Sequence, residues 1–317
     1  MISIPFVEKY RPRTLRDVIG QDEIIARLTG FISDKTMPHL IFAGPAGTGK
    51  TTSAIALARD MFKRNFQSNF KELNASDARG ITVVRTLVKD FARIHPVGDV
   101  PFKILVLDEA DNMTAPAQHA LRRTMENYTK TCRFILICNY SNKIIAPIQS
   151  RCAVLRFKPL DNDDISKRLE YIASKENITI KEKGLDAILY VASGDCRKAV
   201  NILQSVSTMS KEITEDSVYQ ITGRIYPEEI REMITLAIDG RLNLAQEKLE
   251  NLLLEFGLAG SEIIKQIHAE IFNLNISEIL RIDLIKIVGE IDFRLNQGAS
   301  ELIQLNALLA KIVLLKP

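Results

Sequence analysis

One glycine-rich stretch combines the residue types that bind phosphate groups. Residues 44–51 read Gly-Pro-Ala-Gly-Thr-Gly-Lys-Thr and match the pattern G-x-x-x-x-G-K-[ST]. Glycines let backbone N–H groups surround phosphate oxygens, a lysine adds positive charge, and a hydroxyl can ligate Mg²⁺. The pattern predicts a nucleoside triphosphate site. The residues expected to contact the nucleotide here are Gly44, Pro45, Ala46, Gly47, Thr48, Gly49, Lys50, Thr51 and Thr52.

Two adjacent acids follow an apolar run 58 residues beyond Lys50, in the sequence Lys-Ile-Leu-Val-Leu-Asp-Glu-Ala-Asp at residues 103–111. Asp108 would end a buried strand beside the phosphate loop and, with Thr51, hold the Mg²⁺ shell. Glu109 is placed to act as the general base that polarises the attacking water. A solvated acidic turn would explain neither the distance nor the pairing, so the two motifs together predict ATP hydrolysis.

A polar amide, Asn139, follows a third apolar run at residues 134–138. At the carboxyl end of a strand next to the Asp108 strand, it could orient the same water or contact the γ-phosphate. The sequence Asn-Tyr-Ser-Asn at residues 139–142 is equally typical of a turn. The residues alone leave both interpretations open.

Strands alternating with amphipathic helices would position these side chains. This alternation predicts an α/β fold, with a parallel sheet covered by helices on both faces. We expect strands at 39–43, 70–74, 102–107, 133–138 and 154–157, and helices at 51–63, 81–93 and 115–128.

After Pro159 we expect no further strands. Residues 161–223 have the pattern of short helices, Tyr226-Pro227 interrupts the chain, and residues 228–315 have apolar positions at helical spacing. We therefore predict three domains: an α/β ATPase domain at 1–160, a small helical lid at 161–226, and a helical domain at 227–317.

Composition excludes several protein classes. The 317 residues are 46% hydrophobic and 26% charged, which is typical of folded, water-soluble chains rather than disordered ones. No apolar run approaches the roughly 18–20 residues that span a bilayer, and the charged first twenty residues do not resemble a signal peptide. The four cysteines form no CxxC pair, which argues against a zinc site and favours a reducing, cytosolic or nuclear location.

Charge is distributed unevenly along the chain. Residues 1–160 carry 24 Lys and Arg against 14 Asp and Glu, whereas residues 161–317 carry 18 against 25. Within the basic half, the expected helix at 81–93 places Arg85, Lys89 and Arg93 at four-residue spacing, and Arg79 precedes it. A solvated face is the default interpretation of such a stripe, but Asp90 is the only acid available to neutralise it.

The order and spacing of several motifs resemble the clamp loaders of the AAA+ ATPase class, and in particular the replication factor C small subunits. The matching residues cover about 7–201, and the helical domain at 227–317 matches in size and position. The motifs are Val7–Pro12, Gly44–Thr51, Asn74–Asp77 with Arg79-Gly80, Asp108–Asp111, Asn139, Ser150–Cys152 and Gly194–Lys198.

The resemblance assigns roles at the nucleotide, which it implies is ATP with Mg²⁺. It places Val7, Tyr10, Arg11 and Val18 near the adenosine and makes Asn139 a γ-phosphate sensor. Arg197 would reach the same phosphate from the lid. Arg151 would act in trans as an arginine finger on the ATP of a neighbouring subunit.

The resemblance also implies partners: other small subunits and a large subunit, a sliding clamp, and primer–template DNA, with no membrane. The implied function is ATP-dependent opening and loading of the clamp during DNA replication, with the C-terminal helices as an oligomeric collar. Localisation would be cytoplasmic in an archaeon and nuclear in a eukaryote. DNA backbone contacts, without base readout, would come from Arg79, Arg85, Lys89, Arg93 and Lys143.

Two alternatives stand beside this interpretation. One is another AAA+ DNA motor or initiator, such as a junction helicase, which would need a winged-helix-like C-terminal domain. The other is a scaffold subunit that binds nucleotide without hydrolysing it, which the intact Lys50, Asp108, Glu109 and Arg151 argue against.

Overall fold

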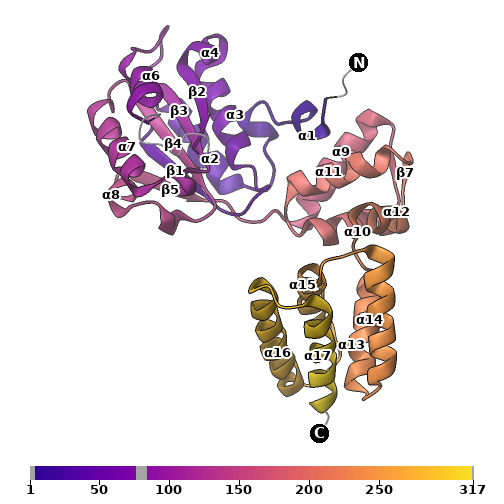
Figure 1. The fold of residues 1–317 in the computed structure, drawn as a ribbon. Coiled ribbons are helices and arrows are strands. Elements are labelled where there is room, and N and C mark those ends of the chain that lie inside the picture. The colour runs from indigo at the N-terminus through magenta and orange to yellow at the C-terminus, as the bar shows by residue number, and fades with distance from the viewer. Residues whose placement is uncertain (1–3, 76–83, 316–317) are drawn as a thin grey trace. The chain divides into compact units, whose positions relative to one another are not determined.

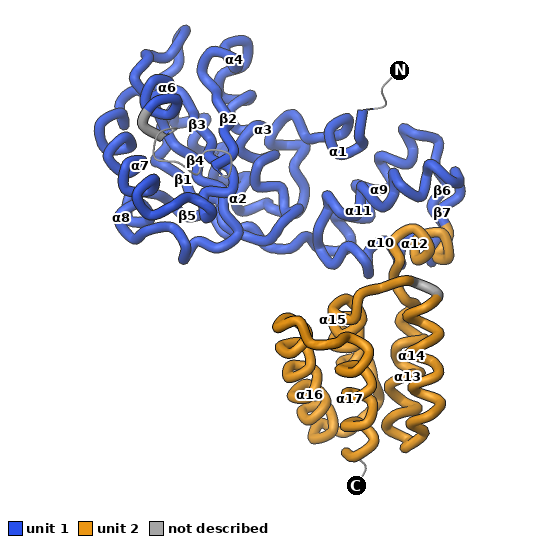
Figure 2. The backbone as a smooth tube through the Cα atoms, viewed as in Figure 1, with its two compact units in different colours: residues 1–213 blue, residues 214–317 orange. Residues whose placement is uncertain are grey.

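The computed structural model describes residues 4–75 and 84–315, and the chain divides into two compact units (Figure 2). Unit 1 comprises residues 1–213 and unit 2 residues 214–317. The finer division into three domains, with boundaries after 160 and 226, stays a prediction. Within the described ranges, no helix combines the length and apolarity needed to cross a bilayer.

A five-stranded parallel sheet forms the centre of unit 1 (Figure 1). The strand order β2-β3-β4-β1-β5 places β4 between β1 and β3, so the segments after β1, β4 and β3 emerge side by side at one edge. The strands are β1 (His39–Ala43), β2 (Phe70–Asn74), β3 (Lys103–Asp108), β4 (Cys132–Cys138) and β5 (Cys152–Arg156).

Helices cover both faces of this sheet. Alternate residues along each strand enter two separate apolar cores, one packed by α2 and α3 and the other by α6, α7 and α8. The predicted α/β class with helices on both faces is therefore confirmed. The elements are α1 (Phe6–Lys9), η1 (Leu15–Asp17), α2 (Asp22–Ser33), α3 (Lys50–Phe62), η2 (Lys63–Asn65), α4 (Phe66–Asn69), η3 (Val84–Val88), α6 (Lys89–Arg93), η4 (Ala110–Asn112), α7 (Ala115–Asn127), η5 (Ser141–Lys143) and α8 (Ala146–Gln149).

The basic helix expected at 81–93 differs from the prediction. Its described part begins with a π-helical turn, η3, and continues as the short α-helix α6. A π turn advances five residues per hydrogen bond rather than four, so the assumed regular α-helical stripe does not hold through it. Residues 76–83 lie outside the described ranges.

The rest of unit 1 is a helical subdomain formed by α9 (Asn162–Glu176), α10 (Glu182–Ala192) and α11 (Cys196–Ser207), which we call the lid helices. The expectation that no strand follows Pro159 is wrong. Two short strands, β6 (Thr179–Ile180) and β7 (Glu212–Ile213), pair in parallel. Two-residue strands carry too little periodicity to be distinguished from loops in a sequence.

In the described residues of unit 2, every regular element is a helix. One apolar core joins its helices, drawing fully buried side chains such as Ile234, Ile267 and Leu308 from three of them. The predicted all-helical C-terminal region is confirmed over this range. The helices are α12 (Glu215–Thr222), α13 (Pro227–Ile238), α14 (Leu242–Phe256), α15 (Gly260–Ile271), α16 (Glu278–Asn296) and α17 (Glu301–Leu314).

Candidate nucleotide-binding site

The glycine-rich loop connects β1 to α3 and is closely packed on two sides. Gly44 lies so near β5 that a Cβ there would come within 2.3 Å of the Phe157 carbonyl oxygen. Gly47 has φ +70°, and a Cβ there would lie 1.7 Å from an oxygen of Asp195. The loop therefore needs glycine both for its left-handed backbone and for the close approach of its neighbours.

Lys50 opens α3, and its ammonium group is directed back into the loop. Its Nζ donates to the carbonyl oxygens of Gly44 and Pro45, each at 2.6 Å, and lies 3.3 Å from Oδ1 of Asn139. Burial lowers the pKa of Lys50, and the negative charge of Asp108 opposes that effect. The cation is thus held among oxygen acceptors at the start of a helix, where an anion is favoured.

Thr51 and Asp108 meet at the predicted metal position. The Thr51 hydroxyl donates to Oδ2 of Asp108 at 2.7 Å, and Oδ1 of Asp108 accepts the backbone N–H of Glu109 at 2.8 Å. A hydroxyl and a carboxylate from adjacent elements provide hard oxygen donors, which Mg²⁺ prefers. The residues present therefore fit Mg²⁺ shared with a phosphate ligand.

Glu109 has an unusual backbone conformation, with φ 54° and ψ 38°. This left-handed geometry is uncommon for residues other than glycine and costs about 1–2 kcal/mol. It reverses the chain immediately after β3 and leaves the Glu109 side chain exposed, where Oε2 accepts a bond from Nδ2 of Asn112 at 3.3 Å. Strained residues of this kind cluster at functional sites.

Asn139 directly follows β4, which lies between the strands that lead to the phosphate loop and to the two acids. Its backbone N–H and that of Tyr140 both donate to Oδ2 of Asp111, each at 3.2 Å. Asp111 therefore fixes the end of β4 and places the Asn139 amide near Lys50. The prediction from residues did not assign a role to Asp111, although its position three residues after Asp108 in the acidic motif was a signal.

A cavity of about 270 Å³ connects these groups. The phosphate loop and both acids contribute to its lining, and so do apolar side chains such as Val7, Val18 and Ile172. Of the predicted nucleotide residues, those that line it are Val7, Tyr10, Arg11, Val18, Ala46, Gly47, Thr48, Gly49, Lys50, Thr51, Thr52, Asp108, Glu109, Asn139 and Arg197; Gly44 and Pro45 instead contribute carbonyls to Lys50.

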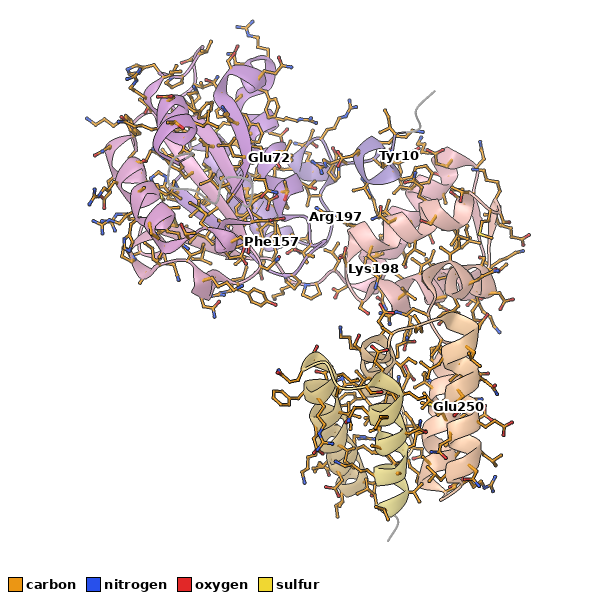
Figure 3. All side chains as sticks on the ribbon, in the orientation of Figure 1. Tyr10, Glu72, Phe157, Arg197, Lys198 and Glu250 are labelled. Carbon is orange, nitrogen blue, oxygen red and sulfur yellow. The ribbon has the colours of Figure 1, made fainter. Side chains whose placement is uncertain are left out.

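The lid helices close one side of this cavity. The backbone N–H of Cys196 donates to the Gly47 carbonyl at 3.3 Å, so α11 begins directly against the phosphate loop. Asp195 caps that helix by accepting the N–H of Lys198 at 2.9 Å. Arg197 is exposed in the first turn of α11 and lines the cavity (Figure 3).

Several lining residues had no signal in the sequence. Arg168 of α9 reaches the cavity and donates to the Tyr10 carbonyl oxygen. As a single arginine on an amphipathic helix, it looks like any solvent-facing residue. The lining also includes apolar side chains to which the sequence assigned no role: Phe6, Ile19, Leu160, Ile172 and Val200.

Arg151 does not line the cavity of its own chain. Its Nη2 lies 2.6 Å from Oε1 of Glu126, and its Nη1 donates to the Pro147 carbonyl at 2.7 Å. The guanidinium is thus held at two points on the surface after α8.

The predicted DNA residues are only partly described. Lys89, Arg93 and Lys143 are exposed, and Nζ of Lys143 lies 5.1 Å from the Tyr140 ring centroid. Arg79 lies outside the described residues, as does the side chain of Arg85.

Solved structures of similar fold include the RuvB protein of Thermotoga maritima. The structure titled RuvB Holliday junction branch migration motor has a TM-score of 0.56 and 17% identity, covering 79% of this chain and 92% of that one. A structure of a single-site mutant of the same protein has a TM-score of 0.58 and 18% identity, with the same coverage. At this identity the likeness concerns the fold alone.

Sequence relatives extend over almost the whole chain. The "Replication factor C small subunit" of Methanococcus maripaludis strain S2 is 52% identical, covering 98% of this chain and 99% of the relative. The proteins of the same name from Archaeoglobus fulgidus and Sulfurisphaera tokodaii are 54% and 53% identical, over 96% and 98% of this chain and 96% and 95% of theirs.

Two family models match separate parts of the sequence. The model of the ATPase family associated with various cellular activities (AAA) matches residues 40–160, which contain the sheet, the phosphate loop and both acids. The model of the replication factor C C-terminal domain matches residues 225–311, within the helical unit 2. The chain is an AAA-class ATPase and belongs to the family of replication factor C small subunits.

Proposed function

We propose that this chain is the ATP-hydrolysing small subunit of a clamp loader, which opens a sliding clamp and loads it onto primer–template DNA. The observation that carries the proposal is the hydrogen bond from Thr51 to Asp108 beside the glycine-rich loop, in a chain about half identical to replication factor C small subunits over nearly its whole length. The family relationship disfavours a junction motor, which shares only the fold.

ATP and Mg²⁺ would bind across the cavity. Lys50 and the loop N–H groups would hold the phosphates, and Thr51 and Asp108 would hold the metal, which neutralises charge on the phosphate oxygens. The apolar lining residues, including Val7, would receive the base. ATP energy would change the conformation of the assembly, with no covalent substrate chemistry.

Hydrolysis would need a base and a sensor from this chain. The exposed Glu109 carboxylate would accept a proton from the attacking water. Asn139, held by the Asp111 contacts to the end of β4, would contact the γ-phosphate near Lys50. Arg197 would reach the same phosphate from the lid helices.

Arg151 would complete the site of a neighbouring subunit. Its position outside the cavity of its own chain, where Glu126 and Pro147 hold it, supports action in trans. Such an arginine finger accelerates hydrolysis by roughly 10³–10⁵. The isolated chain would then be catalytically incomplete, and other small subunits and a large subunit would be needed.

DNA would be held by its backbone. The exposed Lys89, Arg93 and Lys143 would neutralise phosphates, with Arg79 and Arg85 as further predicted contacts. Such contacts are independent of sequence and weaken steeply with salt. The archaeal sources of the three relatives reported above support the archaeal form of the protein, with a cytoplasmic location.

The decisive experiment measures the ATPase rate of the chain, alone and with the large subunit, in the presence and absence of primer–template DNA and sliding clamp. We expect stimulation by DNA and clamp in the full assembly. Glu109→Gln should abolish turnover while ATP binding persists, and Glu182→Gln, at an exposed position on α10, is the matched control. A lack of stimulation under every condition, or indifference to Glu109→Gln, would refute the proposal.

The DNA interface has its own measurement, the salt dependence of DNA affinity. Each lost phosphate contact should reduce the slope of log K against log salt by about 0.9 on duplex DNA. Lys89→Ala and Arg93→Ala should each flatten the slope, whereas Lys183→Ala, at an exposed lysine on α10, should not. Unchanged slopes in both variants would remove α6 from the interface.

A further inference from the structure

The N-terminal segment of residues 6–10, which we call the hook, is bonded to the lid helices. The backbone N–H of Phe6 donates to Oε1 of Gln204 on α11 at 2.8 Å, and the Tyr10 carbonyl accepts from Arg168 on α9. The Tyr10 ring also packs edge-on against Tyr171 at 6.2 Å. The hook therefore moves with the lid helices as long as these contacts hold.

Glu176, the last residue of α9, joins the hook through two side chains at once. A single carboxylate oxygen, Oε1, accepts from Nζ of Lys9 and from the Tyr10 hydroxyl, each at 2.6 Å. These two bonds lower the pKa of Glu176, so the carboxylate is charged at neutral pH. Removing this one carboxylate would therefore release two neighbouring side chains of the hook together.

The chain just beyond the hook is fixed to a different part of unit 1. The backbone N–H of Leu15 donates to Oδ2 of Asp60 on α3 at 2.8 Å, and Leu15 is buried in the core between α3 and the sheet. The intervening residues 11–14 thus connect a segment attached to the lid helices with a segment attached to the ATPase core.

Residues that precede and residues that follow the 11–14 connection both line the cavity. Val7 and Tyr10 line it from the hook, and Val18 and the phosphate loop line it from the core. A ligand with phosphates at the loop and an apolar, planar group at the other end would touch both sides.

We infer that Glu176 is a positioning residue for the nucleotide base: it fixes the hook on the lid helices, so that the base side of the site is carried by the lid. The inference rests on the proposed binding of ATP in this cavity. It predicts that the hook contributes to recognition of the adenosine part of the ligand and contributes little to recognition of the phosphates.

The expected change in ATP affinity follows from the fraction of molecules in which the hook is docked on the lid helices. If the docked hook falls from nearly all molecules to about one tenth, the apparent dissociation constant for ATP rises about tenfold, or about 1.4 kcal/mol. Surface ion pairs by themselves contribute less than this. The larger effect is expected because Glu176 holds Lys9 and Tyr10 together.

The test measures two dissociation constants by calorimetry on the full chain, one for Mg·ATP and one for inorganic tripolyphosphate. Tripolyphosphate has no base, so it reports the groups that bind the phosphates and does not depend on contacts between the hook and the base. Glu176→Ala should weaken ATP about tenfold and leave tripolyphosphate unchanged. Glu176→Gln, which keeps an acceptor oxygen, should restore most of the ATP affinity. Glu170→Ala, at an exposed carboxylate on the same helix, is the matched control.

A double mutant adds a second readout. Tyr10→Phe removes one of the two donors to Glu176, so its effect on ATP affinity should largely disappear in the Glu176→Ala background. Equal ATP affinity in Glu176→Ala and the parent chain, equal weakening of ATP and tripolyphosphate, or fully additive effects would each overturn the inference. If the parent chain binds tripolyphosphate but not ATP, the proposed function fails instead.

Discussion

His39 begins β1, the strand that leads into the phosphate loop, and its imidazole is buried with 6% of its surface exposed. Nδ1 accepts the backbone N–H of Phe134 at 3.1 Å, and Nε2 lies 3.5 Å from the Thr129 hydroxyl. Burial, with a smaller effect from Arg133, lowers the pKa of His39 to about 4. Protonation at Nδ1 would remove the acceptor that Phe134 uses, so the folded protein favours the neutral ring.

This shift predicts an acid-dependent loss of stability. The unfolded-state pKa of about 6.5 lies above the folded-state value of about 4. Above pH 6.5 neither state is protonated, and the contribution of His39 is complete. As the pH falls from 6.5 to 4, the unfolded state binds a proton that the folded state excludes, so the free energy of unfolding decreases. The integrated loss at His39 is about 3 kcal/mol by pH 4.

The perturbation is His39→Asn, because the Asn side-chain oxygen can accept the Phe134 N–H but does not titrate. The two units can unfold separately, so unfolding of unit 1 is followed by hydrogen exchange in urea at pH 7.5 and pH 4. The variant should be less stable at pH 7.5, because it loses the ring contact with Phe134. Its unfolding free energy should nevertheless fall about 3 kcal/mol less than that of the parent on acidification.

His119→Asn is the matched control, since it removes an exposed histidine on α7 instead of a buried one. The comparison uses the difference between variant and parent, so carboxylates that titrate in the same range cancel. An identical fall in His39→Asn and the parent would refute the assignment of a neutral, buried His39.

Three further predictions concern the nucleotide site. Thr51→Ala should weaken ATP binding more than tenfold in the presence of Mg²⁺ and little in its absence, measured by calorimetry, with Thr51→Ser restoring affinity. Gly47→Ala should reduce ATP affinity at least tenfold, since it adds about 1–2 kcal/mol of backbone strain and a close contact between its Cβ and Asp195. Gly30→Ala, on α2 with open space around its Cβ, should leave ATP affinity unchanged. Arg151→Ala assemblies should lose ATPase activity and regain part of it when mixed with Glu109→Gln chains, which supply an intact finger; mixtures without regained activity would contradict action in trans.

Much of the sheet could be predicted because most of its strands are short and apolar, and segments with helical periodicity separate them. Strands β1 and β2 have the predicted bounds, and the other three begin or end within two residues of them. The position of Asp108 beside Thr51 also followed from the sequence. Parallel strands present their carboxyl ends at one edge, so residues that follow β1 and β3 must meet there.

The contacts that complete the site had no local signal. Tyr10 and Glu176 are separated by 166 positions, and nothing in either neighbourhood specifies the other. The left-handed backbone of Glu109 was equally hidden, since a glutamate gives no reason to expect φ of 54°. Periodicity reports which side of a helix is apolar, but it does not report which distant segment that helix will bind.

The uneven charge of the sequence gains a partial structural explanation from the hook. Glu176 belongs to the acidic half of the chain and Lys9 to the basic half, and their ion pair joins the N-terminal segment to the lid helices. Lys50 and Arg197 line the cavity that we propose holds ATP, whose phosphates would neutralise their charge. Arg151 is different, because Glu126 already pairs with it outside the cavity. If Arg151 is to meet a phosphate, a second chain must bring one. We therefore propose that this family member hydrolyses ATP only when it is assembled with neighbouring chains.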